Sequence, residues 1–488
     1  MEDGPRWTRA ELVRRTAGSG LALVVAGCGS RSTGSTRAVA EPRTERARGD
    51  VHRFLSRPDL QPPVVSVLHR LGTTAPGLLF LAPSSGPGQR GCLIVDDRGE
   101  PVWFHPTTPA TAMNLRAAVY RGKPVLTWWE GSTEHGLGTG SHVIVDQSYR
   151  VVDRFPAGHG RPSDLHELML TPEGTALVTS WDVTRRDLRR AGGSAAGRVI
   201  GGIVQELELP TGRLLHEWHS LDHVAPEESH QKVGPRFDYF HVNSVGVAAD
   251  GNLLVSARNT WAVYKIERRS GKVLWRLGGR RSDFAMGPGT VFAWQHDVRD
   301  HEGGRLLSLF DNGGAPRVQP QSKGLVLALD TRRMRATLHR KYTHRPAMRA
   351  HALGSVQLLP NGNVLVGWGT EPYFTEFTAG GAVVYDAKLP HGGQNYRALR
   401  FPWVGRPHIP PRLVARHGSL YASWNGSTEV AAWQIRSGAR PGSLTDGAVT
   451  PREGFETAIA VPGGARYVAA VALDAARKPL ATSGALAL

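Results

Sequence analysis

Two kinds of β-hairpin alternate along most of the chain, and this alternation restricts the possible folds more than any other feature. The first kind joins two apolar strands through Glu-Gly, Asp-Gly or Asn-Gly, as at residues 168–180, 245–256 and 356–367. The second kind follows the first, and its last strand carries an aromatic residue such as Trp218 or Trp275. Two successive hairpins form a four-stranded antiparallel sheet, which is the blade of a β-propeller. A β-sandwich would contain similar hairpins without the alternation, so the sequence predicts an all-β propeller.

The spacing of the hairpins gives the expected extent of the propeller. It predicts six blades, near residues 91–155, 160–220, 238–280, 294–343, 349–400 and 410–438. Because the spacing is irregular, five or seven blades are also compatible with it. We expect the propeller to occupy residues 61–438 and a small C-terminal β extension to occupy residues 439–488. A chain of 488 residues can form one body of this kind, since propellers exceed the usual size of a single domain.

The first 28 residues have the features of a bacterial export signal. Arg14 and Arg15 precede a short apolar run at residues 21–25, and small residues lead to Cys28. This order is typical of a lipoprotein signal in which the cysteine receives the lipid, and the paired arginines also suit twin-arginine export. The alternative is a disordered basic tail in which Cys28 has no role. The apolar run is too short to span a bilayer as a permanent anchor.

We therefore expect an exported protein that is lipid-anchored to the extracellular face of the cell membrane. Residues 29–60 are rich in Ser, Thr, Arg, Gly and Glu without apolar periodicity, and we expect them to form a flexible linker. With Cys28 lipidated, Cys92 has no partner for an intrachain disulfide. These patterns do not determine the oligomeric state.

The formal net charge of +17 comes mostly from arginines scattered along the chain, with one dense cluster at residues 185–190. No RNA- or DNA-binding motif accompanies this cluster, and aromatic residues are not interleaved with it. We therefore expect no nucleic-acid partner. The charge fits better with attraction to anionic small substrates or to an anionic membrane surface.

One histidine recurs at an equivalent position in successive blades. His166, His241, His296 and His351 each precede the first hairpin of their blade. The first strand of each blade lines the central channel of a propeller, so these four side chains should converge at one mouth of the channel. Arg317 follows the strand end at residues 309–313 and could reach over the same mouth. Four neighbours are placed to orient or polarise the imidazoles: Asn243, Asp297, Asn312 and Arg349.

A histidine cluster with an arginine suits the transfer of an anionic group. Imidazole is both a nucleophile and a proton carrier near neutral pH, and guanidinium presents a fixed fork of donors to sulfate or phosphate oxygens. Other interpretations remain open. A single strand histidine is more often a structural hydrogen-bonding group, and Arg317 alone could be a solvated loop residue. Two or three histidines with Glu167 and Asp297 could also hold a metal. We expect a catalytic cluster without metal or other cofactor.

Aromatic residues flank the histidine segments and have two interpretations. They would suit the wall of a pocket for an aromatic substrate, but aromatic side chains are also the usual wedges between blades. The residues are Trp294, Trp368, Tyr373, Phe374, Tyr239 and Phe240.

Several stretches of the sequence resemble the bacterial arylsulfotransferase family, and in particular its actinobacterial and fungal branch. They are residues 91–96 with 101–104, 238–244, 294–297, 309–313, 359–363 with 367–374, and 423–429. The resemblance extends over nearly all of the chain that follows the export signal and the linker.

The resemblance implies a six-bladed propeller that moves a sulfuryl group from an aryl sulfate to a phenol by a ping-pong route. It implies no nucleotide sulfate donor, and the sequence contains no Gly-rich phosphate-binding loop for one. In the family pattern, one channel histidine carries the sulfuryl group, while other histidines and an arginine stabilise charge and move protons. His241 and His296 match the pattern most directly, and Arg317 matches by its distance after His296. His351, or else His166, is the candidate carrier.

Two other functions are compatible with the same fold. The protein could be a non-catalytic cell-surface propeller that binds a ligand or a partner through the channel histidines. A quinone-dependent dehydrogenase is a third interpretation, but its calcium ligands, cofactor-stacking residues and paired cysteines are not found. The sequence therefore favours an arylsulfotransferase that acts on small aromatic sulfates and phenols.

Overall fold

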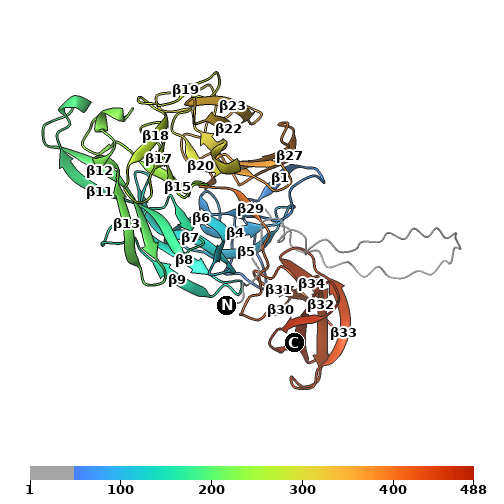
Figure 1. The fold of residues 1–488 in the computed structure, drawn as a ribbon. Helices are drawn as coiled ribbons and strands as arrows, with labels where there is room; N and C mark the ends of the chain where they lie inside the picture. Colours follow the sequence, from blue (N-terminus) through green and yellow to red (C-terminus); the bar gives the residue numbers. More distant parts are fainter. Residues whose placement is uncertain (1–48) are drawn as a thin grey trace, which may run out of the picture. The chain divides into compact units, whose positions relative to one another are not determined.

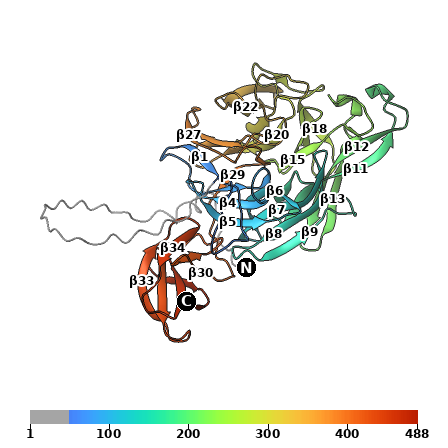
Figure 2. The same cartoon turned by 180° about the vertical axis from the view of Figure 1, so that it is seen from behind.

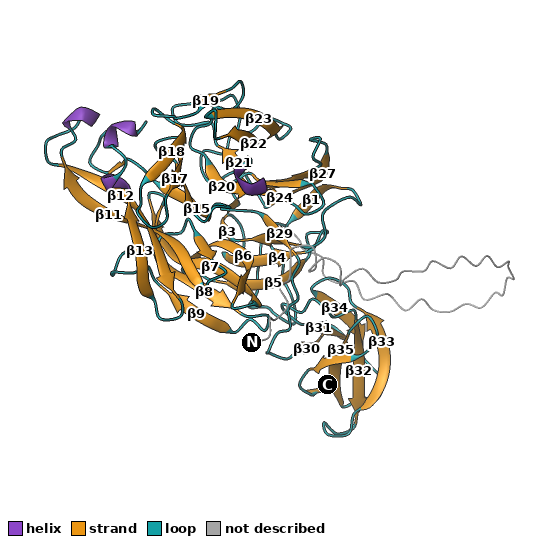
Figure 3. Cartoon of the chain, viewed as in Figure 1, coloured by secondary structure: helices purple, strands orange, loops and turns teal. Residues whose placement is uncertain are grey.

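A computed structural model describes residues 49–488 of the chain. The predicted export signal at residues 1–28, including Cys28, and residues 29–48 of the predicted linker lie outside the described residues. The regular elements of the described part are almost all β-strands, which are labelled in chain order (Figures 1, 2 and 3). Its helices are the short 3-10 helices η1 (Arg189–Ala191), η2 (Ser220–Asp222), η3 (Pro226–Glu228) and η4 (Glu302–Gly304). Over residues 49–488, no helix has the length and apolar character that crossing a membrane requires.

Six sheets, each with a core of four antiparallel strands, form the main body. Sheet 1 contains β29 (Leu399–Phe401), β2 (Leu78–Leu81), β4 (Gly91–Val95) and β5 (Pro101–Pro106). Sheet 2 contains β6 (Thr111–Tyr120), β7 (Lys123–Glu134), β8 (Leu137–Val145) and β9 (Val151–Phe155). Sheet 3 contains β10 (Leu168–Leu170), β11 (Thr175–Arg186), β12 (Gly197–Glu208) and β13 (Arg213–His219).

The other three sheets repeat the same order of strands. Sheet 4 contains β15 (Val242–Val247), β16 (Leu253–Ala257), β17 (Ala262–Ile266) and β18 (Val273–Gly278). Sheet 5 contains β20 (His296–His301), β21 (Leu306–Asp311), β22 (Lys323–Asp330) and β23 (Arg335–Tyr342). Sheet 6 contains β24 (Ser355–Leu358), β25 (Val364–Gly367), β26 (Tyr373–Phe377) and β27 (Val383–Lys388).

Short additional strands attach to this framework. β1 (Ser66–Arg70) pairs with β27, β14 (Phe237–Asp238) with β12, and β19 (Ala285–Met286) with β23. β3 (Pro83–Ser85) and β28 (Gln394–Asn395) form a two-stranded sheet of their own.

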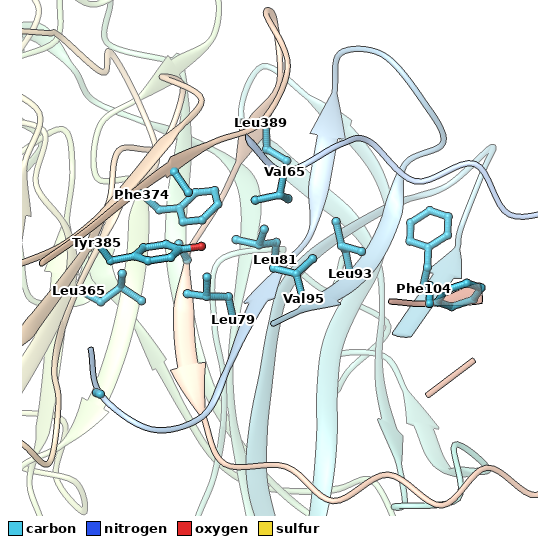
Figure 4. Close-up of a cluster of buried hydrophobic side chains, with 14 of the residues drawn as sticks. Val65, Leu79, Leu81, Leu93, Val95, Phe104, Leu365, Phe374, Tyr385 and Leu389 are labelled. Atoms are coloured by element: carbon cyan, nitrogen blue, oxygen red, sulfur yellow. The ribbon is translucent and has the colours of Figure 1, made fainter. Parts of the chain in front are cut away.

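Apolar clusters between successive sheets join all six into a closed ring. Sheets 1 and 2, 2 and 3, 3 and 4, 4 and 5, and 5 and 6 each share one buried cluster. A sixth cluster joins sheet 6 to sheet 1, where Leu365 and Tyr385 pack with Leu79 and Leu93 (Figure 4). Sheets packed face to face around a ring are a β-propeller, so the predicted fold class is confirmed.

The strand that closes the ring comes from the end of the propeller sequence. β29 pairs with β2, so sheet 1 combines residues more than 300 positions apart. β4 and β5 belong to this sheet and not to the sheet of β6, so residues 91–155, expected as one blade, are divided between sheets 1 and 2. The spacing of hairpins cannot reveal the pairing of β29 with β2, because it reports only on strands that are neighbours in sequence.

Residues 412–487 form a small β-sandwich, which replaces the blade expected at residues 410–438. One sheet contains β30 (Arg412–Arg416), β31 (Ser419–Ser423) and β34 (Glu456–Ala460). The facing sheet contains β32 (Ala432–Gly438), β33 (Thr445–Pro451), β35 (Tyr467–Leu473), β36 (Pro479–Thr482) and β37 (Leu486–Ala487). Leu420, Trp433 and Val468 pack between the two sheets. The strand pairing therefore changes from the propeller to the sandwich between β29 and β30, and residue 438 is the last residue of β32 in the sandwich.

The described end of the predicted linker is also packed and not free. Phe54 is 8% exposed, and its ring lies 4.2 Å from that of Phe455 in the C-terminal sandwich. Ser56 Oγ lies 2.7 Å from Ser423 Oγ, and Leu60 is 2% exposed. The expectation of a flexible linker is thus wrong for residues 51–60, because two apolar side chains in a polar stretch are enough to dock it.

Candidate functional site

Three of the four predicted histidines meet at the inner ends of sheets 3, 4 and 5. His166 and His241 stand just before β10 and β15, and His296 begins β20. The imidazole rings of His166 and His241 are 4.9 Å apart and meet edge to face. Tyr396 contacts both His166 and His296, at ring distances of 5.7 and 6.4 Å. All three histidines are at most 2% exposed.

Two of these imidazoles are paired with carboxylates. Asp164 Oδ2 lies 2.5 Å from Nδ1 of His166, and Asp238 Oδ2 is hydrogen-bonded to Nδ1 of His241. The backbone N–H of Gly138 donates to the other oxygen of Asp164 at 2.7 Å, which fixes that carboxylate. Carboxylates that accept from Nδ1–H leave the reactive lone pair on Nε2.

The third imidazole is held by a neutral amide. Asn312 Oδ1 lies 2.7 Å from Nδ1 of His296. The Asn312 amide nitrogen donates to the carbonyls of Ala350 and Leu353, both at 2.9 Å, so its oxygen must face the imidazole. His296 therefore keeps its proton on Nδ1 and presents an unprotonated Nε2.

Burial and a nearby cation keep the imidazoles of His241 and His296 neutral. Burial lowers the pKa of His241 to about 4, and the positive charge of Arg258 adds to the effect. The same two causes place the pKa of His296 well below its ordinary value. Neutral imidazoles with a free Nε2 are nucleophiles and proton acceptors across the physiological pH range.

Arg258 is the arginine of this cluster, and the sequence did not single it out. It follows β16 in the same sheet as His241, and its guanidinium lies 4.6 Å from the centre of the Trp294 ring. A Cβ atom built at Gly136 would lie 3.3 Å from Cε1 of His241 and 3.9 Å from Nη1 of Arg258, so the three residues are neighbours. Its position in the sequence could have identified it, since Arg258 directly follows the first hairpin of a blade that carries one of the histidines.

His351, the predicted carrier, does not join the cluster. Its side chain is exposed and its Nδ1 lies 3.3 Å from Thr370 Oγ1. The adjacent Ala350 is fully buried, and its carbonyl is held by Asn312. This stretch of backbone thus orients the partner of His296, and in doing so it directs the His351 side chain outward.

Arg317, the predicted anion-binding arginine, also lies elsewhere. It is exposed, and its guanidinium donates to the carbonyls of Gln319 and Pro320 at 3.1 and 3.0 Å. These contacts are within its own loop. Arg317 therefore fits the interpretation of a solvated loop residue, and its place beside the histidines is taken by Arg258.

A buried layer of charged side chains adjoins the histidines. The carboxylate of Glu167 contacts Arg116, Arg299 and Arg397 at 3.3, 2.7 and 3.0 Å. Burial alone would raise the pKa of Glu167, but these arginines lower it to about 2. Asp297 contacts Arg299 and Arg397 at 2.8 and 3.2 Å. Both acids considered as metal ligands are therefore engaged by arginines. Over residues 49–488, no group of His, Cys, Asp and Glu side chains is arranged to hold a metal ion.

Backbone strain is concentrated at the same place. His241, Trp294 and Asp297 have φ angles of 55°, 58° and 54°. The left-handed region costs a non-glycine residue about 1–2 kcal/mol, and such residues gather at functional sites. Because three such residues lie within or beside the histidine cluster, we infer that the surrounding packing holds the backbone there in its strained conformation.

The flanking aromatic residues divide between the two predicted roles. Trp294 and Tyr373 are half-buried, and Trp294 lies against Arg258. The other four, which are at most 1% exposed, are wedges in the apolar clusters: Trp368, Phe374, Tyr239 and Phe240. An aromatic surface beside the cluster is thus supplied by Trp294.

The model of the arylsulfotransferase (ASST) family matches residues 116–389, which is more than half of the chain. The chain belongs to this family. The matched range of the arylsulfotransferase contains His166, His241, Arg258 and His296, whereas the C-terminal sandwich lies outside it. Membership supports an aryl sulfotransferase activity in general, with aromatic sulfates and phenols as substrates.

Solved structures resemble this arylsulfotransferase only distantly. A protein of unknown function from Bacteroides caccae is 14% identical, with a TM-score of 0.42, over 66% of this chain and 98% of that one. A streptogramin B lyase is 12% identical, with a TM-score of 0.36, over 73% and 93%. The propeller of Dos1 is 11% identical, with a TM-score of 0.30, over 65% and 67%. These values carry no information about activity. No curated protein matches the sequence.

Proposed function

We propose that this arylsulfotransferase moves a sulfuryl group from an aryl sulfate donor to a phenolic acceptor through a covalent sulfohistidine, without a nucleotide donor. The observation that carries the proposal is the meeting of three buried imidazoles, each fixed through Nδ1, with one guanidinium. An acceptor for the sulfuryl group, proton carriers and a cation for the sulfate oxygens are then present at one place.

His296 is the carrier in this proposal. Its Nε2 attacks sulfur, the N–S bond forms, and the S–O bond to the aryl group breaks. Asn312 accepts from Nδ1 without carrying a negative charge, so the sulfated ring keeps an electron-poor, imidazolium-like character. That character makes it a good leaving group in the second step, when the phenol oxygen attacks sulfur and the N–S bond breaks.

His166 and His241 move the protons. Their carboxylate partners, Asp164 and Asp238, stabilise an imidazolium when one forms. In the first step, the aryl group leaves as its oxide, and the charge of Arg258 stabilises the negative charge that develops. In the second step, a neutral imidazole takes the proton of the incoming phenol and then passes it to solvent or to the released aryl oxide, which restores the neutral ring.

Arg258 holds the sulfuryl oxygens. Its guanidinium lies against the Trp294 ring and near the imidazole of His241, so an anion beside His296 meets a guanidinium fork and its aryl group meets an indole face. The positive charge is fixed in place before the reaction, which is the arrangement that lowers a barrier most.

The test is an intact-mass measurement on the full chain after incubation with a chromogenic aryl sulfate, with and without a phenol. We expect phenol release and the mass of one sulfuryl group, mapped by peptide analysis to His296. His296→Asn should lose the adduct, and His351→Asn should keep it. An adduct on another histidine would overturn the assignment of the carrier. A folded sample without adduct or turnover would instead support the non-catalytic binding propeller.

We also propose that the chain is exported and anchored to the membrane through lipid on Cys28. The support is the order of paired arginines, apolar run and small residues before the cysteine. Metabolic labelling with a fatty acid should mark the wild-type chain and not Cys28→Ala. Equal labelling of both would contradict the anchor.

A further inference from the structure

The hairpin of β11 and β12 ends in a dense group of arginines. We name residues 185–198 the arginine arm. It contains Arg185, Arg186, Arg189, Arg190 and Arg198, and Asp187 is its only acidic residue. All five arginines are exposed. The proposed reaction uses none of them.

The arm is a folded element. Leu188 is 1% exposed and packs in the same cluster as Val199 and Phe237. The backbone N–H of Leu188 donates to Ser194 at 2.9 Å, and that of Gly193 donates to Leu188 at 2.8 Å. The arginines are therefore presented on a fixed support, with η1 carrying Arg189 and Arg190.

The arm lies on the same side of the propeller as the histidines. Thr179 of β11 is level with the site, because its hydroxyl donates to Asp164 at 3.3 Å. The strand then continues to Arg186, about 20 Å further at the rise of a β-strand. The returning strand β12 pairs with β14, whose Asp238 holds His241. The arm thus projects beyond the histidine cluster, at the end of the propeller where the proposed reaction places the substrate.

The charges of the arm are not satisfied by the part of the protein that the structure describes. Arg185 and Arg198 are directly paired across the two strands, an arrangement that is unfavourable for like charges. Within residues 49–488, only Arg189 of the arm has a counter-ion, Asp187, at 2.5 Å. Arg186 is paired with Gly197 in the next register position, so its side chain leaves the opposite face of the hairpin from that of Arg185. Side chains that diverge in this way cannot enclose one small anion, but they fit an extended anionic surface.

We propose that the arginine arm docks onto the anionic phospholipids of a membrane surface. Each arginine near such a surface contributes to binding, and the effect of several adds up. Val183, which is 44% exposed on the same hairpin, gives the arm an apolar side chain beside its cations. Docking through the arm turns the mouth of the site towards the lipid, where phenolic molecules of low polarity accumulate.

The test compares two triple variants of the full chain on vesicles. The arm variant is Arg186→Ser, Arg190→Ser, Arg198→Ser. The control removes three exposed arginines in or next to turns at the opposite end of sheets 4 and 5: Arg269→Ser, Arg332→Ser, Arg335→Ser. The two variants have the same net charge, and neither changes the histidine cluster. Binding is measured by co-sedimentation with phosphatidylcholine vesicles, with and without phosphatidylglycerol.

We expect the wild-type chain and the control to bind the vesicles that contain phosphatidylglycerol, and the arm variant to bind them about 100-fold more weakly. Equal losses in the two variants, or equal binding to pure phosphatidylcholine, would overturn the proposal. Binding of inorganic polyphosphate by the arm without binding to anionic vesicles would overturn it as well. Turnover of a soluble aryl sulfate should be the same in all three proteins, so the result is independent of whether the proposed sulfuryl transfer is correct.

Discussion

At the scale of single residues, the three imidazoles differ in what holds Nδ1. His166 and His241 face carboxylates, and His296 faces the amide of Asn312. A carboxylate favours the protonated ring, whereas a neutral amide fixes the tautomer and leaves the ring neutral. In the proposed mechanism, this difference separates two proton carriers from one nucleophile, although all three side chains are equally buried.

Arg258 gives the first prediction. Because it is the cation beside the imidazoles, Arg258→Leu should lower kcat/KM for an aryl sulfate by about 100- to 1,000-fold, the usual effect of removing one charge-stabilising donor. Arg258→Lys should recover part of this loss, since it restores the charge without the fork. Steady-state kinetics with a chromogenic donor measures both.

Arg317→Leu is the matched control, because the guanidinium of Arg317 donates to carbonyls of its own loop. It should leave kcat/KM within a factor of two or so of wild type, as a solvated residue does. A loss in Arg317→Leu as large as that in Arg258→Leu would reverse the assignment.

His142 gives a prediction about acid stability. It is fully buried in β8, both ring nitrogens lack hydrogen-bond partners among the described residues, and burial lowers its pKa to about 4. Between pH 6.5 and pH 4 the unfolded chain binds a proton here that the folded chain does not, so the free energy of unfolding falls as the pH falls. His142→Leu should reduce that dependence by about 1.4 kcal/mol per pH unit.

Urea unfolding at several pH values in this range measures the effect of His142→Leu. The exposed His391 provides the control, since His391→Leu should leave the pH dependence unchanged. An unaltered slope in His142→Leu would show that this histidine does not stay neutral in the folded protein.

At the scale of elements, the tip of the β7–β8 hairpin covers the site. Gly136 at this tip has φ of 83°, and a Cβ atom there would lie 3.3 Å from His241. Gly136→Ala should therefore displace His241 or the tip and lower kcat about tenfold, with a loss of stability of about 1 kcal/mol from the left-handed backbone.

Gly122 separates these two effects. Its φ is 74°, and a Cβ atom added there would have no atom of residues 49–488 within 4 Å beyond its immediate chain neighbours. Gly122→Ala should show the same loss of stability in thermal unfolding and no loss of kcat. If Gly136→Ala and Gly122→Ala were equally active, the contact of the hairpin tip with the His241 imidazole would have no effect on the reaction.

At the scale of the whole molecule, the ring of sheets is tied together by buried charge. Arg397 precedes the closing strand β29 and is 1% exposed. It contacts Glu167 before sheet 3, Asp297 in sheet 5 and the side-chain oxygen of Asn114 in sheet 2. One side chain thus connects the closing segment with three other sheets at the level of the histidines.

Removing the Arg397 side chain should destabilise the protein strongly, because the carboxylates of Glu167 and Asp297 would stay buried with one positive charge fewer beside them. Arg397→Met is expected to lower the free energy of unfolding in urea by about 3–5 kcal/mol, and adding Glu167→Gln should restore part of it. Arg406→Met breaks the exposed pair with Glu429 and should change stability by at most about 1 kcal/mol. Similar losses in Arg397→Met and Arg406→Met would contradict a role for the buried layer in closing the ring.

The sequence by itself determined the features that depend on neighbouring residues. Gly in the tight turns and the two-residue period of the strands specify hairpins locally, so the propeller was predictable from them. The position of His166, His241 and His296 at the start of inner strands was predictable for the same reason, because alternation along a strand sets its register.

Only the tertiary structure decided which strands and side chains meet across long separations. β29 joins sheet 1 from the far end of the propeller, and the hairpin strands near residue 430 join a sandwich, because pairing depends on apolar faces that hairpin spacing does not record. Arg258 and Arg317 occupy similar loop positions in sequence, yet one stacks on Trp294 and the other bonds its own loop. His351 points outward because Ala350 is buried and its carbonyl is needed by Asn312. The direction of a loop side chain is set by packing and hydrogen bonds from distant residues, and these exist only in the folded chain.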